Sequence, residues 1–264
     1  MYPIIDCHCH IYPDKIAQKA SDATGKFYDI KMHYNGTAKE LGSFGSAAQI
    51  SHYIVFSVAT TPKQVASINS FIADLVSKNT NMTGLGTLHP DSDDLEGDIE
   101  NIISLGLRGV KLHPEIQGFK IDDYRCLKIY EKCEGKLPVL IHTGDSRYDM
   151  SNPNRLKPIL ETYTDLTVIG AHFGGYSVWE NAVDELKSYK NFFVDTSSTF
   201  PFISTEQARR YIKTYGAEKI MFGTDYPMWN PKDEVEYLLN LGLDEDEYKK
   251  IFYENAQKLF KIQL

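Results

Sequence analysis

Two histidines close to the start of the chain have the spacing of metal ligands. His8 and His10 alternate with Cys7 and Cys9, directly after the apolar run 3–5, which is typical of a buried strand. Alternate side chains of a strand share one face, so the two imidazoles point the same way and can ligate one metal ion. The cysteines must then face away, which argues against a zinc site built from all four side chains.

Other polar residues that could complete such a site stand at the ends of later strand-like runs. His142, His172 and Asp225 each follow apolar residues whose alternation leaves the polar side chain pointing inward. We predict that His8, His10, His142 and Asp225 ligate one divalent ion, with zinc preferred over manganese or iron. Water bound to such an ion has a pKa of about 7, and Asp225 is predicted to accept its proton as general base. His172 is predicted to orient the water or to polarise a substrate carbonyl.

Two cations are candidates for binding an anionic substrate. Lys111 lies at the end of another predicted strand, and Arg147 lies in the loop after His142. Each also has an ordinary interpretation, because a single lysine at a strand end is usually solvated and Arg147 could equally be a surface residue. Asp6 shares the face of the histidines one layer deeper, where it could hydrogen-bond them. The loop after Asp225 offers further aromatic surface.

Alternating strands and helices must position these residues. After the first strand, strand-like runs cover 52–58, 82–89, 107–113, 137–142, 166–172, 191–196 and 219–225. Helical patterns cover 62–79, 92–105, 123–134, 155–163, 177–188, 204–215, 232–240 and 244–261. The connection 11–50 is expected to hold one helical turn at 17–23, with glycines at 36, 42 and 45 interrupting the remainder.

This alternation predicts a parallel sheet, and eight strand–helix units in 264 residues favour a distorted TIM (β/α)8 barrel. An open doubly wound sheet is the alternative, but no Gly-x-Gly-x-x-Gly turn follows any predicted strand. Because no low-complexity linker divides the chain, we expect one domain over 1–264. In a barrel of this kind the active site lies at the carboxyl ends of the strands, which is where the polar residues named above fall.

Composition excludes several classes of partner. A net charge of -8 and the lack of any Lys/Arg-rich run argue against nucleic acid, and no apolar stretch is long enough to span a bilayer. No basic segment followed by an apolar one opens the chain, so we expect no secretory signal and a cytoplasmic location. Cys7, Cys9, Cys126 and Cys133 are expected to be free core thiols. The expected partner is a small molecule, with a carboxylate among the candidates, and dimers are common for such barrels.

The motifs together resemble the amidohydrolase superfamily, and within it the amidohydrolase-2 branch, which includes aminocarboxymuconate-semialdehyde decarboxylase. They are Asp6-Cys-His8-Cys-His10, Gly109-Val-Lys111-Leu-His113-Pro, Ile141-His142-Thr-Gly, Ala171-His172-Phe-Gly-Gly and Phe222-Gly-Thr-Asp225-Tyr-Pro. The resemblance implies metal ligation by His8, His10, His142 and Asp225, catalysis by His172 and proton transfer by Asp225. Binuclear members carry a carboxylated lysine, for which Lys111 is the candidate, with His172 on the second ion. We expect one metal.

Three functions compete. The preferred one is a metal-dependent hydrolase that attacks an amide, ester or lactone carbonyl. The alternative is a metal-dependent non-oxidative decarboxylase of a small aromatic or unsaturated carboxylic acid. A barrel that only binds a metal or ligand is the third, and the inward carboxylate of Asp225 argues against it.

Overall fold

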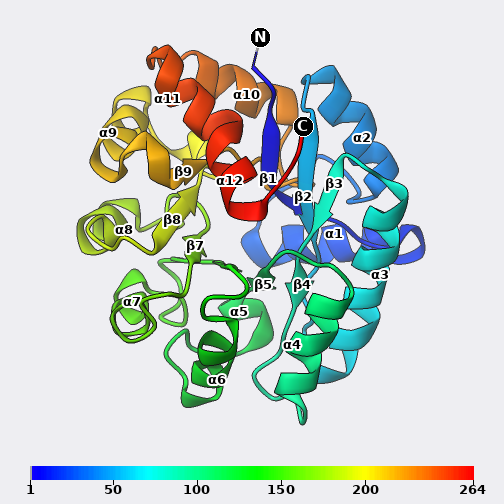
Figure 1. The fold of residues 1–264 in the computed structure, drawn as a ribbon. Coiled ribbons are helices and arrows are strands. Elements are labelled where there is room, and N and C mark those ends of the chain that lie inside the picture. Colours follow the sequence, from blue (N-terminus) through cyan, green and yellow to red (C-terminus); the bar gives the residue numbers. More distant parts are fainter. Residues whose placement is uncertain (1) are drawn as a thin grey trace. The chain divides into compact units, whose positions relative to one another are not determined.

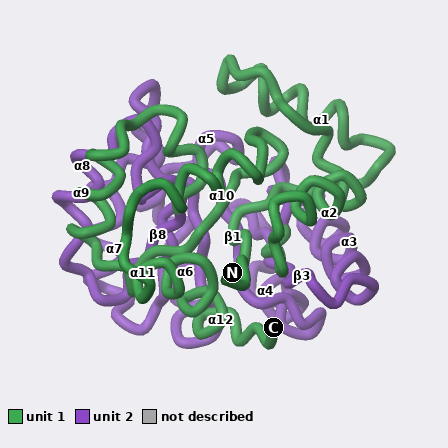
Figure 2. Tube along the Cα trace, turned by 90° about the horizontal axis from the view of Figure 1, so that it is seen from above, with its two compact units in different colours: residues 1–55, 196–264 green, residues 56–195 purple. Residues whose placement is uncertain are grey.

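The structure, a computed structural model, describes residues 2–264. The chain forms two compact units, shown in two colours in Figure 2. Unit 1 comprises Met1–Val55 together with Thr196–Leu264, and unit 2 comprises Phe56–Asp195. A single domain over 1–264 stays a prediction. In the described part of the chain, no helix has both the length and the apolar character needed to cross a membrane.

In unit 2 helices alternate with strands, and all the strands named below except β3 pair in parallel with their neighbours in that unit (Figure 1). Its strands are β3 (Met82–Gly84), β4 (Gly86–Thr87), β5 (Val110–Leu112), β6 (Val139–Ile141), β7 (Val168–Gly170) and β8 (Phe192–Asp195). Its helices are η1 (Pro62–Gln64), α3 (Val65–Lys78), α4 (Leu95–Ser104), α5 (Pro114–Gln117), α6 (Tyr124–Cys133), η2 (Pro153–Leu156), α7 (Lys157–Thr162) and α8 (Trp179–Leu186).

The register of these strands brings the polar residues to one edge. From β5 to β7, Leu112 pairs with Ile141 and Ile141 with Gly170. His113 and His142 each follow the last residue of their strand, so the register places them next to each other. These strands also carry buried valines that belong to the core, since Val110, Val139 and Val168 are at most 1% exposed.

Unit 1 holds both ends of the chain. Its elements are β1 (Ile5–His10), α1 (Asp14–Tyr28), α2 (Ala38–Ala47), most of β2 (His52–Phe56), η3 (Phe200–Phe202), α9 (Thr205–Tyr215), η4 (Ala217–Lys219), β9 (Ile220–Met221), α10 (Pro231–Leu239), α11 (Glu245–Lys249), the π-helical η5 (Lys250–Glu254) and α12 (Asn255–Phe260). The predicted final helix is therefore present, and Asp244 begins it with a capping box to Glu247.

Within unit 1, β1 lies beside the segment that follows β9. The amide of Cys7 donates to the carbonyl of Phe222 at 2.8 Å, and the amide of His10 donates to the carbonyl of Tyr226 at 2.7 Å. Cys9 and Tyr226 form a parallel bridge. These bonds join segments from opposite ends of the chain, and they set the two histidines of β1 beside Asp225.

Each predicted strand has a counterpart, but one prediction differs in detail. The run 82–89 is two strands, β3 and β4, interrupted at Leu85. A Cβ on Gly84 would lie 2.6 Å from a methyl of Ile72, and one on Gly86 would lie 2.6 Å from Ile102. The helices α3 and α4 therefore press directly on the backbone here, which only glycine allows.

The interpretation of residues 11–50 as a connection with one helical turn is wrong, because α1 and α2 occupy most of it. The buried side of α1 consists of Ala17, Ser21 and Gly25, spaced four residues apart. These residues are small or polar, so they leave no apolar periodicity in the sequence. In α2, Thr37 accepts the amide of Glu40 as N-cap, and Gly45 lies inside the helix rather than interrupting it.

Gly45 is required for packing, and this can be tested. A Cβ at this position would overlap the ring and hydroxyl of Tyr53, which is 1% exposed and has little room to move. We expect Gly45→Ala to lower the free energy of unfolding by about 1–3 kcal/mol, as for other overpacked sites. Gly42 of the same helix has no atom within 4 Å of its would-be Cβ, so Gly42→Ala should instead stabilise by about 0.5–1 kcal/mol. Urea denaturation of both variants checks this, and equal effects would contradict the role of Tyr53.

The four cysteines are free and buried, as predicted. On β1, Cys7 and Cys9 are 3% and 0% exposed, and the Cys9 thiol contacts the carbonyl of Asp6 rather than either imidazole. Burial also raises the pKa of the Cys9 thiol. These thiols are therefore packing groups of the core.

Candidate active site

His8, His10 and Asp225 form one cluster in unit 1. The Nε2 atom of His8 lies 3.3 Å from Oδ1 of Asp225, and Nε2 of His10 lies 3.5 Å from the same oxygen. The two imidazole centroids are 5.3 Å apart. His8 is fully buried and Asp225 is 7% exposed. Two nitrogens and one oxygen thus converge on one point, which is an arrangement of donors suited to a metal ion.

Gly223 allows this convergence. A Cβ on Gly223 would lie 2.9 Å from the Cβ of His8, too close for any other residue. The sequence predicted an inward Asp225, and the structure places His8 against the glycine two residues before it.

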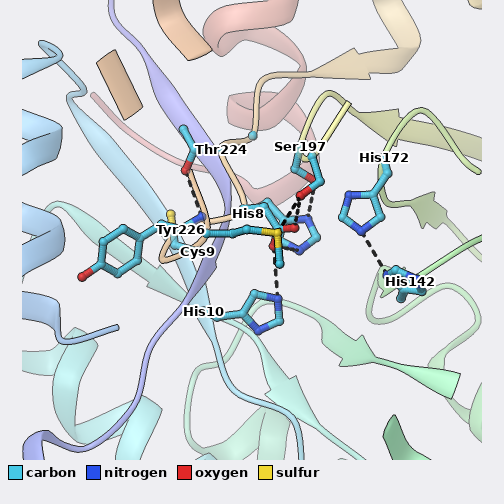
Figure 3. Close-up of polar contacts among 12 residues, drawn as sticks. His8, Cys9, His10, His142, His172, Ser197, Thr224 and Tyr226 are labelled. Atoms are coloured by element: carbon cyan, nitrogen blue, oxygen red, sulfur yellow. Dashed lines mark hydrogen bonds and ion pairs between the residues drawn. The ribbon is translucent and has the colours of Figure 1, made fainter. Parts of the chain in front are cut away.

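Serine hydroxyls contact two members of this cluster, and Figure 3 labels one of these pairs, Ser197 and His8. Ser197 Oγ lies 3.0 Å from Nδ1 of His8, on the side of the ring opposite to Nε2. Such a contact holds the ring in place, with Nε2 facing Asp225. The hydroxyl of Ser198 donates to Oδ2 of Asp225. Neither serine was predicted, because a Thr-Ser-Ser-Thr run carries no recognisable signal.

Hydrogen bonds of Asp6 link β1 to the loop that carries Asp225. Its Oδ1 accepts the amides of His8 at 3.1 Å and of Thr224 at 3.0 Å, and its Oδ2 accepts the Thr224 hydroxyl at 2.5 Å. Burial raises the pKa of Asp6 to about 6 in spite of these donors. Asp6 therefore supports the histidines through the backbone of β1.

In unit 2, His142 contacts His172. Nδ1 of His142 and Nε2 of His172 are 3.0 Å apart, as the dashed line in Figure 3 shows. His172 follows β7, and its amide donates to Oδ1 of Asp195 at 3.1 Å. Both histidines are 2% exposed. The structure thus brings together the two histidines that were predicted as metal ligand and catalytic group.

Residues with left-handed backbone concentrate next to these groups. His172 has φ 61°, Asp225 has φ 58° and Ser198 has φ 45°. This region costs a residue with a Cβ about 1–3 kcal/mol, and it persists only where surrounding contacts impose it. Such strain is common at active sites, and here it directs a polar side chain just after each of the strands β7, β8 and β9.

Glu115 is a buried acid beside this pair that the sequence did not reveal. The rings of His113 and His142 stack at 4.1 Å, and Oε2 of Glu115 lies 3.5 Å from Nδ1 of His113 and 4.0 Å from Nε2 of His142. The other oxygen, Oε1, accepts the amide of Ser151 at 3.1 Å and its hydroxyl. Ligand atoms of His113, Glu115 and His142 all lie within 4.8 Å of one another, so this group could also hold a cation. The local signal was a Glu two residues after a strand-end histidine, which is too common to use.

The ionisation of Glu115 should appear in the pH dependence of stability. Burial raises the pKa of Glu115 from 4.5 to about 7. The contribution of a carboxyl with a raised pKa is fully present below pH 4.5 and is lost as the pH rises through about 7. In metal-free protein, unfolding free energy relative to Glu115→Gln should therefore fall by about 3 kcal/mol between pH 4.5 and pH 8. Glu131→Gln, on the exposed face of α6, is the control, and parallel curves for all three proteins would contradict the prediction.

The two predicted substrate-binding cations differ in their surroundings. Lys111 on β5 is fully buried, with its ammonium 5.1 Å from the ring centre of Phe56. Arg147 pairs with Asp145 of its own loop through two bonds of 2.9 and 2.7 Å, and its side chain is 40% exposed. Lys111 therefore lies in the interior of unit 2, whereas Arg147 is partly exposed and pairs with a carboxylate.

Solved structures are similar to this chain over nearly its whole length. A TIM-barrel protein from Bordetella bronchiseptica is 20% identical, with a TM-score of 0.82 and 98% of both chains covered. The 5-carboxyvanillate decarboxylase from Sphingomonas paucimobilis is 17% identical, with a TM-score of 0.75 and 100% of both chains covered. A dihydroxybenzoic acid decarboxylase from Polaromonas sp. JS666, solved with manganese and 2-nitroresorcinol, is 18% identical, with a TM-score of 0.77 and 99% and 97% covered. These likenesses show the predicted TIM-barrel fold.

Sequence comparison gives a shorter match to a curated relative. Gamma-resorcylate decarboxylase from Polaromonas sp. (strain JS666 / ATCC BAA-500) is 29% identical over 123 residues. This stretch covers 39% of the present chain and 37% of that relative.

The match to a protein family covers far more of the chain. The amidohydrolase family matches residues 5–262, a range that contains both histidine clusters and Asp225. This agrees with the motifs at the strand ends. The chain is therefore an enzyme of the amidohydrolase family.

Proposed function

We propose that this enzyme is a metal-dependent, non-oxidative decarboxylase of a small aromatic carboxylic acid. The observation that carries the proposal is the convergence of His8, His10 and Asp225 in unit 1. The choice of reaction is supported by the relatives named above, which include decarboxylases of gamma-resorcylate, 5-carboxyvanillate and dihydroxybenzoic acid. The hydrolase activity that the sequence favoured has no support from these relatives, and the alternative fits them better.

We propose His8, His10 and Asp225 as metal ligands, with His142 as the fourth ligand that the sequence predicts. The donor separations of 3.3 and 3.5 Å in unit 1 fit such a site, since two ligands about 2.1 Å from one tetrahedral ion lie about 3.4 Å apart. Manganese is supported by the ion in the dihydroxybenzoic acid decarboxylase structure, and zinc by the nitrogen-rich donor set. When bound, such an ion supplies a Lewis acid that stabilises negative charge on substrate oxygens.

The side chains would carry out the proton chemistry. Release of carbon dioxide breaks the bond between the ring carbon and the carboxylate and leaves an electron pair on that carbon, which must accept a proton. We assign transfer of this proton to Asp225, which takes it up from water and passes it to the ring carbon, and orientation of the reacting group to His172. Lys111 is the candidate that we favour for attracting the substrate anion, because it is a buried cation on β5, the strand that His113 follows.

A substrate panel tests the reaction. Protein loaded with manganese or zinc is incubated with hydroxybenzoic acids on one side and with lactones and amides on the other. We expect carbon dioxide release from at least one aromatic acid and no hydrolysis. Hydrolysis of a lactone or amide without carbon dioxide release from any acid would overturn the proposal.

A further inference from the structure

Ser198 lies between Asp225 and an indole ring in unit 1. It is 1% exposed, and its hydroxyl donates to Oδ2 of Asp225. The indole Nε1–H of Trp229 donates to the same hydroxyl at 2.8 Å. Both partners come from the segment after β9, whereas Ser198 belongs to the segment after β8. The hydroxyl therefore links two loops that each follow a strand end.

The direction of this chain of hydrogen bonds follows from the chemistry of its members. An indole nitrogen only donates, an ionised carboxylate only accepts, and a hydroxyl can do both. The series of hydrogen bonds must therefore run from Trp229 through Ser198 to Asp225. The bond to the carboxylate is charge-assisted, and it is strengthened because the hydroxyl is itself polarised by the indole N–H.

This series of hydrogen bonds gives the two carboxylate oxygens of Asp225 different contacts. Oδ2 is occupied by Ser198, and Oδ1 faces Nε2 of His8 at 3.3 Å and Nε2 of His10 at 3.5 Å. Rotation of the carboxylate would break the bond to Ser198 and move Oδ1 away from both nitrogens. We infer that Ser198, oriented by Trp229, is a positioning residue that holds Asp225 in the orientation required for metal binding.

The backbone of Ser198 supports a role for its hydroxyl. Its φ of 45° lies in the region where glycine is the least strained residue. Serine bears this cost and supplies the hydroxyl that glycine lacks. Ser198→Gly is therefore an informative variant, since it removes the hydroxyl while it relieves the backbone.

The inference rests on the proposed metal site, and metal binding tests it independently of turnover. Metal-free protein is titrated with Mn²⁺ alone, with binding followed by calorimetry. We expect Ser198→Gly to raise the Kd for Mn²⁺ by about 10–100-fold, as for other side chains that support a metal ligand. Trp229→Phe keeps the hydroxyl but removes the donor that orients it, and should raise the Kd by a smaller factor. Ser43→Ala is the control, because this hydroxyl of α2 is exposed and donates to the carbonyl of Lys39.

Fluorescence adds a second readout. The chain has two tryptophans, so Trp179→Phe leaves Trp229 as the only indole. In that background, binding of Zn²⁺, which does not quench by paramagnetism, should change the Trp229 emission. The change should disappear when Ser198→Gly is added.

The outcomes separate the two proposals. Failure of the unsubstituted protein to bind Mn²⁺ or Zn²⁺ overturns the metal site and with it this inference. A Kd within twofold of the unsubstituted value in folded Ser198→Gly overturns the inference alone. If Ser198→Gly does not fold, Trp229→Phe decides, and a Kd for Mn²⁺ within twofold of the unsubstituted value in that variant overturns the inference.

Discussion

Replacement of Asp225 by asparagine should lower turnover by about a thousandfold or more, the largest effect that we expect from a single substitution. The amide cannot carry a proton to the substrate, and it removes the negative charge that faces His8 and His10. It can still accept the hydrogen bond of Ser198, so the local fold should survive. Carbon dioxide release and metal content per chain are the measurements.

A nearby carboxylate provides the control for this substitution. Asp233 is exposed in the first turn of α10, eight residues beyond Asp225, and Asp233→Asn should leave turnover and metal content unchanged. If Asp225→Asn retained both full metal content and full activity, the assignment of proton transfer to Asp225 would be wrong.

Removal of the metal is the second large effect. Treatment with a chelator should abolish measurable turnover, and titration with Mn²⁺ or Zn²⁺ should restore it with a plateau at about one equivalent per chain. Mg²⁺ should restore much less, because it prefers oxygen ligands and the proposed site offers three imidazole nitrogens. Metal analysis of the reconstituted protein follows the same titration.

A plateau at two equivalents would contradict the single-ion site. The second ion would then be bound by Lys111 and His172, as in binuclear members of the superfamily, or by the His113–Glu115–His142 group of unit 2. Glu115→Gln separates these two cases, because it removes a donor of the second group and leaves Lys111 intact.

Local patterns predicted most of the elements and the types of residue in the site. Alternation on β1 separated His8 and His10 from the cysteines, and the apolar runs predicted strands whose ends carry His142, His172 and Asp225. The same rule failed for α1 and α2. Helix α1 buries Ala17, Ser21 and Gly25, which are too small or too polar to produce an apolar period.

The support of the site could not be predicted in this way. Asp6 bonds Thr224, and Ser197 bonds His8, across sequence separations of 218 and 189 residues. Glu115 lies against His113 and His142 because the strands β5 and β6 pair in one particular register. No short stretch of sequence contains this information.

The sequence by itself determined which residues can bind a metal or carry a proton, because residue type and strand alternation are local properties. Only the tertiary structure decided how they are held: which oxygen of Asp225 faces the histidines, which hydroxyl occupies the other, and which buried acid lies beside His142. The physical reason is that hydrogen bonds between distant segments depend on how the strands pair. They also depend on the left-handed backbone at Ser198, His172 and Asp225. Such a backbone persists only where surrounding contacts impose it.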